Sequence, residues 1–384
     1  MYRIAIDVGG TFTDCLVLDE STGDVRQFKA PTTPSDPSVG LMDALEKAAV
    51  AYGFEVAGFL AQVGLLIHGT TLATNTLIKK DGAMTGMVTT RNFADVIEIR
   101  RGYKNVRTSM YNVFVPPYEP LVPRRRRLEV TERSTYEGEV VTALDEDDVR
   151  RAAEQLRDDG VESVAICYLH SYAAPENERR TEEIVREILP DAHVATSHDI
   201  LPVWREWERF STAVVWAYVG PVVERYLEAL EGRLHENDFV GTLLMMLSDG
   251  LVETVERCRQ RAVYLIGSGP AAAPAAAIYA GETAGHRNVL SFDMGGTSID
   301  IGVIIDAEVP TRTESWAGDE RVGIKMVDVH SAGAGGGSIA WIDSLGLLRV
   351  GPQSAGSDPG PACYDKGGTS PTTTDADVLL GYVD

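Results

Sequence analysis

The order of apolar and polar residues predicts strands and helices that alternate over most of the chain. Where apolar residues recur every three or four positions, as at 37–52, one helical face carries Leu41, Ala44, Leu45 and Ala48. The same spacing predicts helices at 72–80, 145–159, 176–188 and 206–234. Apolar runs predict strands at 2–6, 15–18, 25–29, 64–68, 84–89, 163–168, 192–196 and 241–247. This order of elements predicts an α/β protein.

Two stretches depart from the pattern. Between 103 and 139, Pro116, Pro117, Pro120 and Pro123 predict irregular structure. Residues 262–281 carry no charge over 20 positions, about the length that crosses a membrane. Two glycines and two prolines interrupt them, so we expect a short strand, a turn and an Ala-rich helix, with no membrane partner.

An eight-residue pattern, D-x-G-G-T-x-x-D, occurs at 7–14 and again at 293–300. Around both copies the apolar runs predict strand, Gly-Gly turn, strand, turn and strand, which is a β-meander. For the second copy these strands are predicted at 289–292, 301–305 and 308–311. Two such units predict two similar lobes that face each other.

The predicted boundary between the lobes lies near 190–205, which gives a first lobe of 1–195 and a second of 196–384. Roughly 95 residues follow the start of the second meander, fewer than the roughly 100–150 of an ordinary domain. We therefore expect an incomplete second lobe, and a chain that is the N-terminal part of a longer protein.

A Gly-Gly-Thr turn between acidic residues suits a polyphosphate. Glycine permits positive φ and lets backbone N–H groups approach phosphate oxygens, so Gly9, Gly10, Gly295 and Gly296 are candidate nucleotide ligands. Thr11, Thr13 and Thr297 would add hydroxyl groups. Four aspartates complete this set: Asp7, Asp14, Asp293 and Asp300. Their carboxylates suit a hydrated Mg²⁺ ion, or would orient a water or a substrate hydroxyl, better than they suit direct contact with phosphate. The alternative is an ordinary tight hairpin, which the repetition of the pattern disfavours.

A third glycine cluster, Gly333, Gly335, Gly336 and Gly337, follows an apolar run at 325–329. A glycine-rich turn can bind phosphate or pack against a nucleotide. The alternative is a flexible loop; beside the two hairpins we expect a third wall of the nucleotide site.

Other polar residues are weaker candidates for substrate contact. His68 ends a predicted strand, where it could polarise a substrate carbonyl with help from Thr70, Thr71 and Asn75, or could simply be bonded to the backbone. Asp328 and His330 could face the cleft or form the polar edge of a strand. For the basic residues Arg100, Arg101 and Lys104, a solvated turn is favoured over a site.

Composition narrows the classes of function. The chain has 35 basic and 57 acidic residues, a formal net charge of −22, which disfavours nucleic acid and an anionic membrane as partners. Four scattered cysteines give no zinc or redox motif, and Cys363 is expected to be buried. No P-loop, H-E-x-x-H or G-x-S-x-G motif is present. We expect a cytoplasmic protein.

The paired hairpins resemble the acetate kinase, sugar kinase, Hsp70 and actin superfamily of two-lobed ATPases. The whole chain is similar to the hydantoinase A / 5-oxoprolinase family, which includes N-methylhydantoinases and the ATP-using subunits of acetone and acetophenone carboxylases. The motifs that carry this likeness include IAIDVGGTFTD, HGTTLATNTLI, SVAICYLHSY, FDMGGTSIDIG, VHSAGAGGGSIAW and TTTDADVLLG.

The resemblance implies ATP and Mg²⁺ as cofactors and a hydantoinase B-like large subunit in a hetero-oligomer. The implied reaction transfers the γ-phosphoryl group of ATP to the oxygen of a cyclic amide for ring opening, or of a ketone or bicarbonate for carboxylation. Asp7, Asp14, Asp293 and His68 would be catalytic, with Asp7 and Asp293 on the metal. The alternatives are a small-molecule kinase of the same superfamily and a nucleotide-binding structural subunit without turnover.

Overall fold

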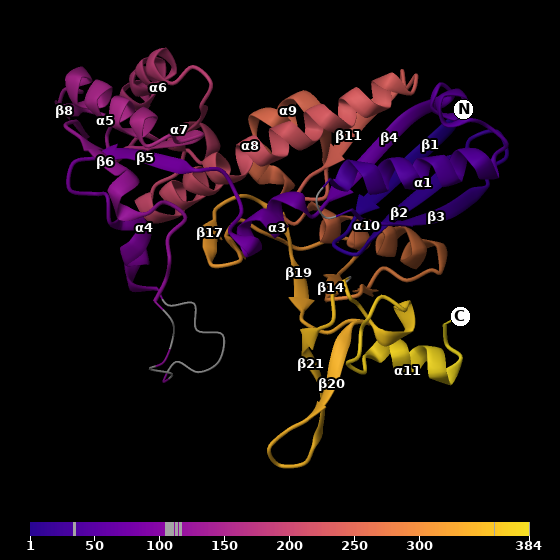
Figure 1. The fold of residues 1–384 in the computed structure, drawn as a ribbon. Coiled ribbons are helices and arrows are strands. Elements are labelled where there is room, and N and C mark those ends of the chain that lie inside the picture. The colour runs from indigo at the N-terminus through magenta and orange to yellow at the C-terminus, as the bar shows by residue number, and fades with distance from the viewer. Residues whose placement is uncertain (34–35, 104–110, 112–113, 115–116, 357, 384) are drawn as a thin grey trace.

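The computed structural model describes residues 1–33, 36–103, 111, 114, 117–356 and 358–383. Within these residues six strands form one twisted sheet in the order β12-β11-β4-β1-β2-β3. Their bounds are β1 Tyr2–Val8, β2 Phe12–Asp19, β3 Val25–Pro31, β4 Val63–Thr70, β11 Thr242–Met246 and β12 Val252–Thr254. β1, β2 and β3 form the predicted antiparallel meander, and β4 pairs with both β1 and β11 in parallel (Figure 1).

Helix α1 (Pro37–Ala51) covers one face of this sheet. Asp36 caps it by accepting a hydrogen bond from the Ser38 N–H, and Pro37 occupies the first helical position, where no N–H is needed. The face predicted from the spacing, Leu41, Ala44, Leu45 and Ala48, is fully buried. The prediction of this helix is therefore confirmed.

A second, parallel sheet lies at the other end of the molecule, with the order β10-β9-β5-β6 in the described part of the chain (Figure 1). Its strands are β5 Thr85–Thr90, β6 Arg127–Val130, β9 Ser163–Cys167 and β10 His193–Thr196. The amphipathic helices α5 (Glu146–Asp158) and α6 (Glu176–Ile188) pack on it and enclose their own apolar core. β6 lies inside the stretch predicted to be irregular.

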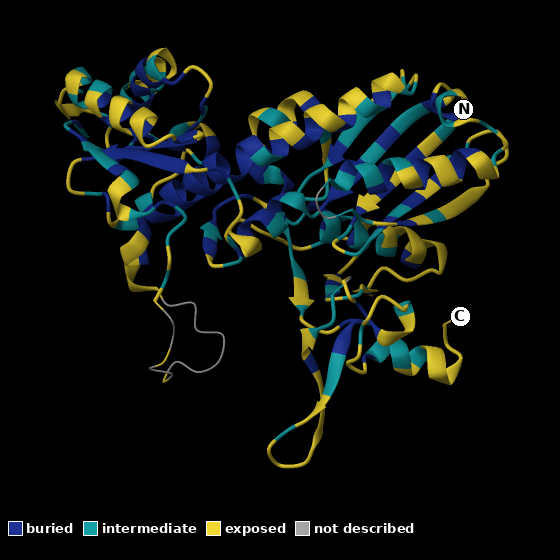
Figure 2. Ribbon diagram, in the orientation of Figure 1, coloured by how far each residue is buried: buried dark blue, intermediate teal, exposed yellow. Residues whose placement is uncertain are grey.

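Helix α8 (Glu206–Glu236) joins the two sheets. Every residue from Trp207 to Pro221 is buried, as Figure 2 shows, because this half of the helix contacts β9 and β10 on one side and β17 on another. A helix that is buried all round belongs to the centre of a protein. The six-stranded sheet contains strands from both sides of the predicted boundary at 195, and the division into two lobes stays a prediction.

The second copy of the motif forms the hairpin β13 (Val289–Met294) and β14 (Ile299–Ile304). The third strand beside it is β19 (Val329–Ala332). In the predicted range 308–311, Glu308 forms an isolated bridge with Ile305, and Thr311 begins a short strand that pairs elsewhere. The second unit is thus not a consecutive meander. The strand predicted at the start of 262–281 is also wrong, because Ala262–Leu265 forms a 3₁₀ helix, η3, before helix α10 (Ser268–Thr283).

The remaining elements are short. They are α2 Val56–Leu60, α3 Leu72–Lys79, α4 Val96–Ile99, η1 Arg100–Gly102, η2 Arg124–Arg126, β7 Arg133–Ser134, β8 Val140–Thr142, α7 Ser197–Ile200, α9 Val255–Gln260, β15 Thr311–Arg312, β16 Ser315–Ala317, β17 Glu320–Val322, β18 Met326–Val327, β20 Ser338–Ile342, β21 Leu348–Ser354, η4 Ala362–Tyr364 and α11 Thr373–Leu380. Among the described residues no helix is long and apolar enough to span a bilayer.

Candidate functional site

The two hairpins have the same backbone geometry. Asp7 pairs across the strands with Asp14, as Asp293 does with Asp300. The turns close identically, since the Gly9 N–H donates to the Phe12 carbonyl at 3.0 Å and the Gly295 N–H donates to the Ser298 carbonyl at 2.9 Å. The repeat in the sequence is therefore a repeat in space.

The glycines of these turns are needed for a reason other than the one we predicted. Gly9, Gly10, Gly295 and Gly296 lie outside the left-handed region, so positive φ does not explain them. A Cβ on Gly9 would lie 3.1 Å from the Phe12 carbonyl oxygen, and one on Gly296 would lie 3.3 Å from Thr11 Oγ1. Close approach selects glycine at these two positions, and the second distance shows that the two hairpin tips lie next to each other.

Each tip presents two adjacent amide groups to a ligand. Within the described residues, the N–H groups of Gly10 and Thr11 have no hydrogen-bond acceptor, and neither do those of Gly296 and Thr297. Consecutive N–H groups at a turn form a concave site for an anion. Thr297 is exposed and Thr11 half-buried, so both hydroxyl groups are accessible beside these amides.

The acidic residues of both hairpins interact across the site. The pKa of Asp7 is raised to about 6, mainly because protein surrounds its carboxylate, and further by the charges of Asp14, Asp293 and Asp300. Asp7 nonetheless keeps surface accessible to solvent, so a ligand can reach it. Burial also raises the pKa of Asp300, although a hydrogen bond from the Ser331 hydroxyl opposes this. Uncompensated negative charge at Asp7 favours a bound cation.

Two predicted residues of the first hairpin face elsewhere. Thr13 is fully buried, with Oγ1 3.1 Å from Thr32 Oγ1, because alternation along β2 turns it into the core. This burial does not support its predicted contact with a nucleotide. Asp14 is accessible but forms an ion pair with Lys29 on β3 at 3.0 Å.

Three amides of the third glycine cluster are bonded to protein, and the cluster supports the second hairpin. The Gly336 N–H donates to the Gly295 carbonyl at 3.0 Å, and the Gly337 N–H donates to the Gly296 carbonyl at 2.6 Å. A third amide, on Gly335, donates to Ser338 Oγ, and a Cβ on Gly335 would lie 2.7 Å from backbone carbon of Gly296. These three amides are bonded to protein, which does not support phosphate binding by them; a third wall that packs against a nucleotide stays a prediction. Gly333 is exposed at the edge of the turn.

His68 is a core residue. It is fully buried on β4, with Nε2 2.7 Å from the Tyr226 hydroxyl and Nδ1 3.3 Å from the Ile6 carbonyl. Burial lowers the pKa of its imidazole to about 4, so the ring is neutral near pH 7. Both nitrogens have protein partners, and this geometry does not support the predicted catalytic contact.

The residues that follow His68 connect β4 to the first hairpin. Thr70 is buried and exchanges hydrogen bonds with Ser268 at the start of α10. The Thr71 hydroxyl donates to the Val8 carbonyl at 3.3 Å and accepts from Asn75 Nδ2 at 3.0 Å. Thr71 and Asn75 are half-buried, and Thr71 lies near Asp7, whereas Thr70 is not accessible to a substrate.

Asp328 and His330, which we predicted could face the cleft together, have different surroundings. Asp328 forms an ion pair with Arg312 at 2.7 Å. His330 is exposed on β19, opposite Ile301 of β14. Cys363, which we expected to be buried, is exposed. Lys104 lies outside the described residues. The solvated turn that we predicted is wrong for Arg100, which is buried.

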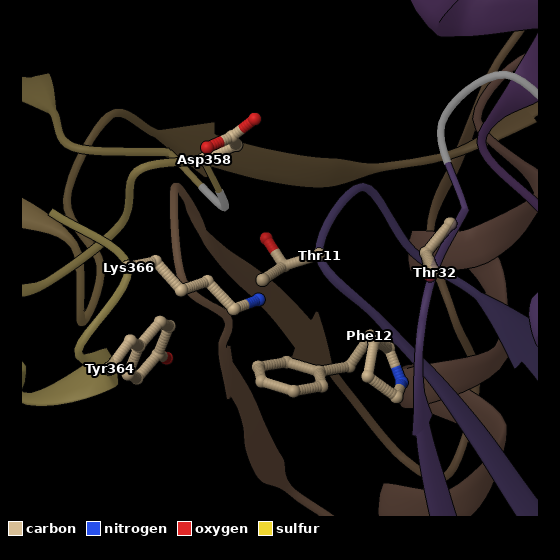
Figure 3. Close-up of a pocket in the computed structure, with 7 residues that line it drawn as sticks. Thr11, Phe12, Thr32, Asp358, Tyr364 and Lys366 are labelled. Atoms are coloured by element: carbon tan, nitrogen blue, oxygen red, sulfur yellow. The ribbon is translucent and has the colours of Figure 1, made fainter.

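A cavity of about 580 Å³ adjoins the tip of the first hairpin. It is lined by Thr11, Phe12, Pro31, Thr32, Asp358, Tyr364 and Lys366. Figure 3 shows the Lys366 ammonium group reaching across it toward Thr11 and the Phe12 ring. No ion-pair partner for Lys366 exists in the described ranges. Sequence reasoning missed Lys366 because no recognisable phosphate motif surrounds it.

The donor set of the hairpins fits a hydrated magnesium ion. Mg²⁺ keeps several waters and takes one or two carboxylates together with substrate phosphates. Asp7 and Asp293 would supply such carboxylates. Among the residues that the structure describes, no group of three or more His, Cys, Asp or Glu residues is arranged as a metal cage.

Sequence profiles of one family match almost the whole chain. The profile described as "Hydantoinase/oxoprolinase N-terminal region" matches residues 3–189, and "Hydantoinase/oxoprolinase" matches residues 209–384. The chain belongs to the hydantoinase/oxoprolinase family. The predicted resemblance is confirmed.

Named relatives in this family are similar over the full chain. The caprolactamase subunit alpha of Pseudomonas jessenii is 40% identical over 382 residues, which are 100% of this chain and 55% of the relative. The acetophenone carboxylase gamma subunit of Aromatoleum aromaticum is 37% identical over 99% of this chain and 53% of its own length. The chain thus spans about half the length of these curated relatives.

Solved structures of the family share the fold. The crystal structure of the ATP-dependent caprolactamase from Pseudomonas jessenii superposes with a TM-score of 0.87 at 40% identity, over 100% of this chain and 55% of that one. The nucleotide-free structure of acetone carboxylase superposes with a TM-score of 0.86 at 28% identity. The match covers 100% of this chain and 56% of that one. The mixed α/β architecture is therefore shown.

Proposed function

We propose that this chain is the ATP-using part of an enzyme that activates a carbonyl oxygen by phosphorylation, with a cyclic amide as the preferred substrate class. The observation that carries this is the pair of neighbouring hairpin tips, each with two adjacent amides that have no acceptor among the described residues. Support for ATP comes from the family, whose related structures are titled ATP-dependent caprolactamase and ATP-dependent acetone carboxylation. The caprolactamase relative, at 40% identity, favours the amide over the ketone.

The proposed chemistry suits a site made of backbone amides. An amide carbonyl oxygen attacks the γ-phosphorus, the bond from that phosphorus to the β,γ-bridging oxygen breaks, and ADP leaves with its electron pair. The amide nitrogen releases its proton to solvent, and the amide becomes an O-phosphorylated imidate, whose carbon is open to attack by water. Phosphoryl transfer needs positioning and charge neutralisation more than covalent assistance. The amides of Gly10, Thr11, Gly296 and Thr297 would position the phosphate oxygens.

The remaining residues would neutralise charge and orient the substrate. A magnesium ion, when bound by Asp7 and Asp293, would neutralise the phosphates and the carboxylates together. Lys366 would add positive charge at the first tip, and the hydroxyl groups of Thr11 and Thr297 would donate to phosphate. Thr71, which lies near Asp7, and Asn75, which donates to the Thr71 hydroxyl, are the half-buried polar residues that could contact the substrate.

A partner is part of the proposal. The caprolactamase and acetophenone carboxylase relatives are named as subunits, which supports a hetero-oligomer. We propose that a hydantoinase B-like large subunit completes hydrolysis of the phosphorylated amide. A small-molecule kinase would instead release a stable phosphate ester without such a subunit, and mass spectrometry of the products separates these two functions.

Calorimetric titration of Mg-ATP into the chain tests the nucleotide site. We expect saturable binding that Asp293→Ala reduces by at least about 100-fold. Asp306→Ala is the matched control, because Asp306 is an exposed carboxylate in the turn that follows β14, away from the tips. Absence of binding by well-folded protein, or equal binding by both variants, would contradict the proposal.

A further inference from the structure

One wall of the cavity beside the first hairpin is a loop of residues 358–368. Three side chains of this loop line the cavity: Asp358, Tyr364 and Lys366 (Figure 3). The loop returns on itself, because a Cβ on Gly368 would overlap the Gly360 carbonyl oxygen. Lys366 is exposed and Tyr364 is half-buried, so burial alone does not fix where these side chains lie. Their place in the cavity depends on what holds the loop.

Asp375 of α11 holds this loop at η4. Its Oδ1 accepts a hydrogen bond from the Cys363 N–H at 2.8 Å, and its Oδ2 accepts one from the Ala362 N–H at 3.4 Å. Ala362 and Cys363 are the first two residues of η4, where N–H groups have no acceptor inside the helical turn. Asp375 supplies the acceptors that this turn cannot supply, two to three residues before Lys366.

The same carboxylate caps the helix that carries it. Asp375 Oδ2 accepts from the Thr372 N–H at 2.9 Å and from Thr372 Oγ1 at 2.8 Å, and the Asp375 N–H donates back to Thr372 Oγ1 at 3.3 Å. This is a capping box. Desolvation opposes ionisation of Asp375, but the donors at Cys363 and Thr372 outweigh it and lower its pKa to about 2. At neutral pH the carboxylate is therefore charged, and both of its oxygens are bonded.

Helix α11 is in turn attached to the glycine cluster that supports the second hairpin. The Thr374 N–H donates to the Gly336 carbonyl at 2.7 Å, and a Cβ on Gly336 would lie 2.6 Å from Thr374 Oγ1. The Gly336 N–H itself donates to the Gly295 carbonyl in the second tip. Asp375 thus connects the support of the second hairpin to the cavity wall that faces the first.

The loop held by Asp375 reaches the first hairpin directly. The rings of Tyr364 and Phe12 meet edge to face, with centres 6.4 Å apart, and the Lys366 ammonium group extends toward Thr11 (Figure 3). Phosphoryl transfer is sensitive to displacements of about 1 Å in the groups that position the phosphates. We propose that Asp375 is a positioning residue of the nucleotide site, which holds η4 so that Lys366 points at the first hairpin tip. This inference rests on the proposed function, because it assigns that lysine to the phosphates of ATP.

Cys363 offers a probe of the loop that does not depend on nucleotide. Its thiol is exposed, whereas Cys15, Cys167 and Cys258 are buried, so a thiol reagent should titrate one thiol in the folded chain. Desolvation raises the pKa of Cys363, and so do a hydrogen bond to Asp375 and the charge of that carboxylate. Removal of the Asp375 charge should therefore increase the thiolate fraction and the rate of reaction.

Labelling of nucleotide-free protein with 5,5′-dithiobis(2-nitrobenzoic acid) tests the attachment. Asp375→Asn should raise the rate at Cys363 at least about threefold, because the thiol becomes more acidic and η4 loses its anchor. Asp377→Asn is the matched control: it removes the same charge from α11, and the Asp377 side chain forms no hydrogen bond or ion pair with the described residues. Equal rates in the unaltered protein and Asp375→Asn would overturn the proposal.

Calorimetry of Mg-ATP tests whether the attachment matters for the nucleotide. Asp375→Asn should weaken binding about five- to tenfold, and Asp377→Asn should leave it unchanged. The double variant Asp375→Asn, Lys366→Met should lose no more than about tenfold, since both changes remove one contact. Losses that multiply to about 100-fold would show that Asp375 does not act through Lys366, and would overturn the proposal.

The two measurements separate this inference from the proposed function. If the unaltered chain binds no Mg-ATP, the proposed function is overturned and the inference falls with it. If Asp375→Asn binds Mg-ATP as tightly as the unaltered chain while Cys363 reacts faster, only the positioning role is overturned.

The number of reactive thiols checks that each variant is folded, because an unfolded chain exposes all four cysteines. Should Asp375→Asn titrate four thiols, the unaltered protein decides. Saturating Mg-ATP should then slow labelling of Cys363 about threefold or more, because a nucleotide bound to Lys366 holds η4, and should have no such effect on Lys366→Met. An unchanged rate in the unaltered protein would overturn the proposal.

Discussion

The two hairpins have one local geometry and two different surroundings. The first hairpin is internal to the six-stranded sheet, with β4 and β3 on its two sides and α1 over one face. In the described chain the second has β19 on one side, and Leu290 and Phe292 of β13 are 68% and 67% exposed. The Gly-Gly turn therefore forms from its own residues, whereas its stability comes from neighbours that differ between the copies.

The largest effect is expected when the second hairpin loses the backbone support that the third glycine cluster gives it. Gly335→Ala would place a Cβ 2.7–2.8 Å from backbone atoms of Gly295 and Gly296. Backbone cannot move aside cheaply, so we expect a loss of about 3 kcal/mol in stability, measured by denaturant unfolding. Gly10→Ala is the control, because its Cβ would meet open space and its φ is not left-handed. Equal loss in both variants would show that Gly335 is not a support.

The first hairpin is supported by His68 of the neighbouring strand β4, whose Nδ1 lies 3.3 Å from the Ile6 carbonyl of β1. His68→Phe fills a similar volume but leaves the Tyr226 hydroxyl without its partner at 2.7 Å. We expect a loss of about 2 kcal/mol in unfolding free energy with unchanged Mg-ATP affinity of the folded protein. A catalytic His68 would give the reverse: preserved stability and lost turnover with substrate.

The cavity beside the first tip offers a smaller test. Lys366→Met should weaken Mg-ATP about tenfold, equivalent to about 1.4 kcal/mol, and the loss should diminish at high salt because the contact is electrostatic. Lys29→Met is the matched control, since Lys29 is already paired with Asp14. Calorimetry at two ionic strengths measures the Mg-ATP affinity of both variants. An unchanged affinity for Lys366→Met would show that Lys366 does not contact the nucleotide.

The smallest effect concerns pH in the absence of nucleotide and metal. The folded-state pKa of Asp7, about 6, exceeds its ordinary value of 3.8, so the folded protein binds more protons between these values and loses stability as pH rises through them. Because Asp7 is accessible to solvent, we expect a change of under about 1 kcal/mol. Thermal unfolding should show that Asp7→Asn removes this loss between pH 4 and pH 7 while weakening Mg-ATP. If the unaltered protein and Asp7→Asn lose stability in parallel as pH rises, a group other than Asp7 causes the loss.

Local patterns predicted the parts of the fold that depend on neighbouring residues in the chain. The hairpins follow from their repeated motif, and α1 follows from its apolar face and its Asp36 cap. The third strand beside the second hairpin was predicted wrongly, because β14 pairs with β19, about 25 residues further along, and no local pattern specifies that partner.

The site was predictable to a similar degree. The aspartates and glycines of the tips were identified from spacing, but Thr13 could have been excluded from the alternation of β2 alone. Lys366 carries no sequence signal, since it gains its surroundings from Thr11, Phe12 and Thr32, which are distant in the chain. The inward orientation of His68 likewise depends on Tyr226 of α8.

The order of strands in the six-stranded sheet has a consequence for synthesis of the protein. β4 ends at Thr70, and its partner β11 begins at Thr242, about 170 residues later. At a ribosomal rate of about 5–20 residues per second, the edge of β4 is without that partner for roughly 10–35 s. During this interval the parallel sheet of β5, β6, β9 and β10 can fold as a unit of its own. The nascent chain therefore exposes an apolar strand edge that a chaperone would have to protect until α8 and β11 leave the ribosome.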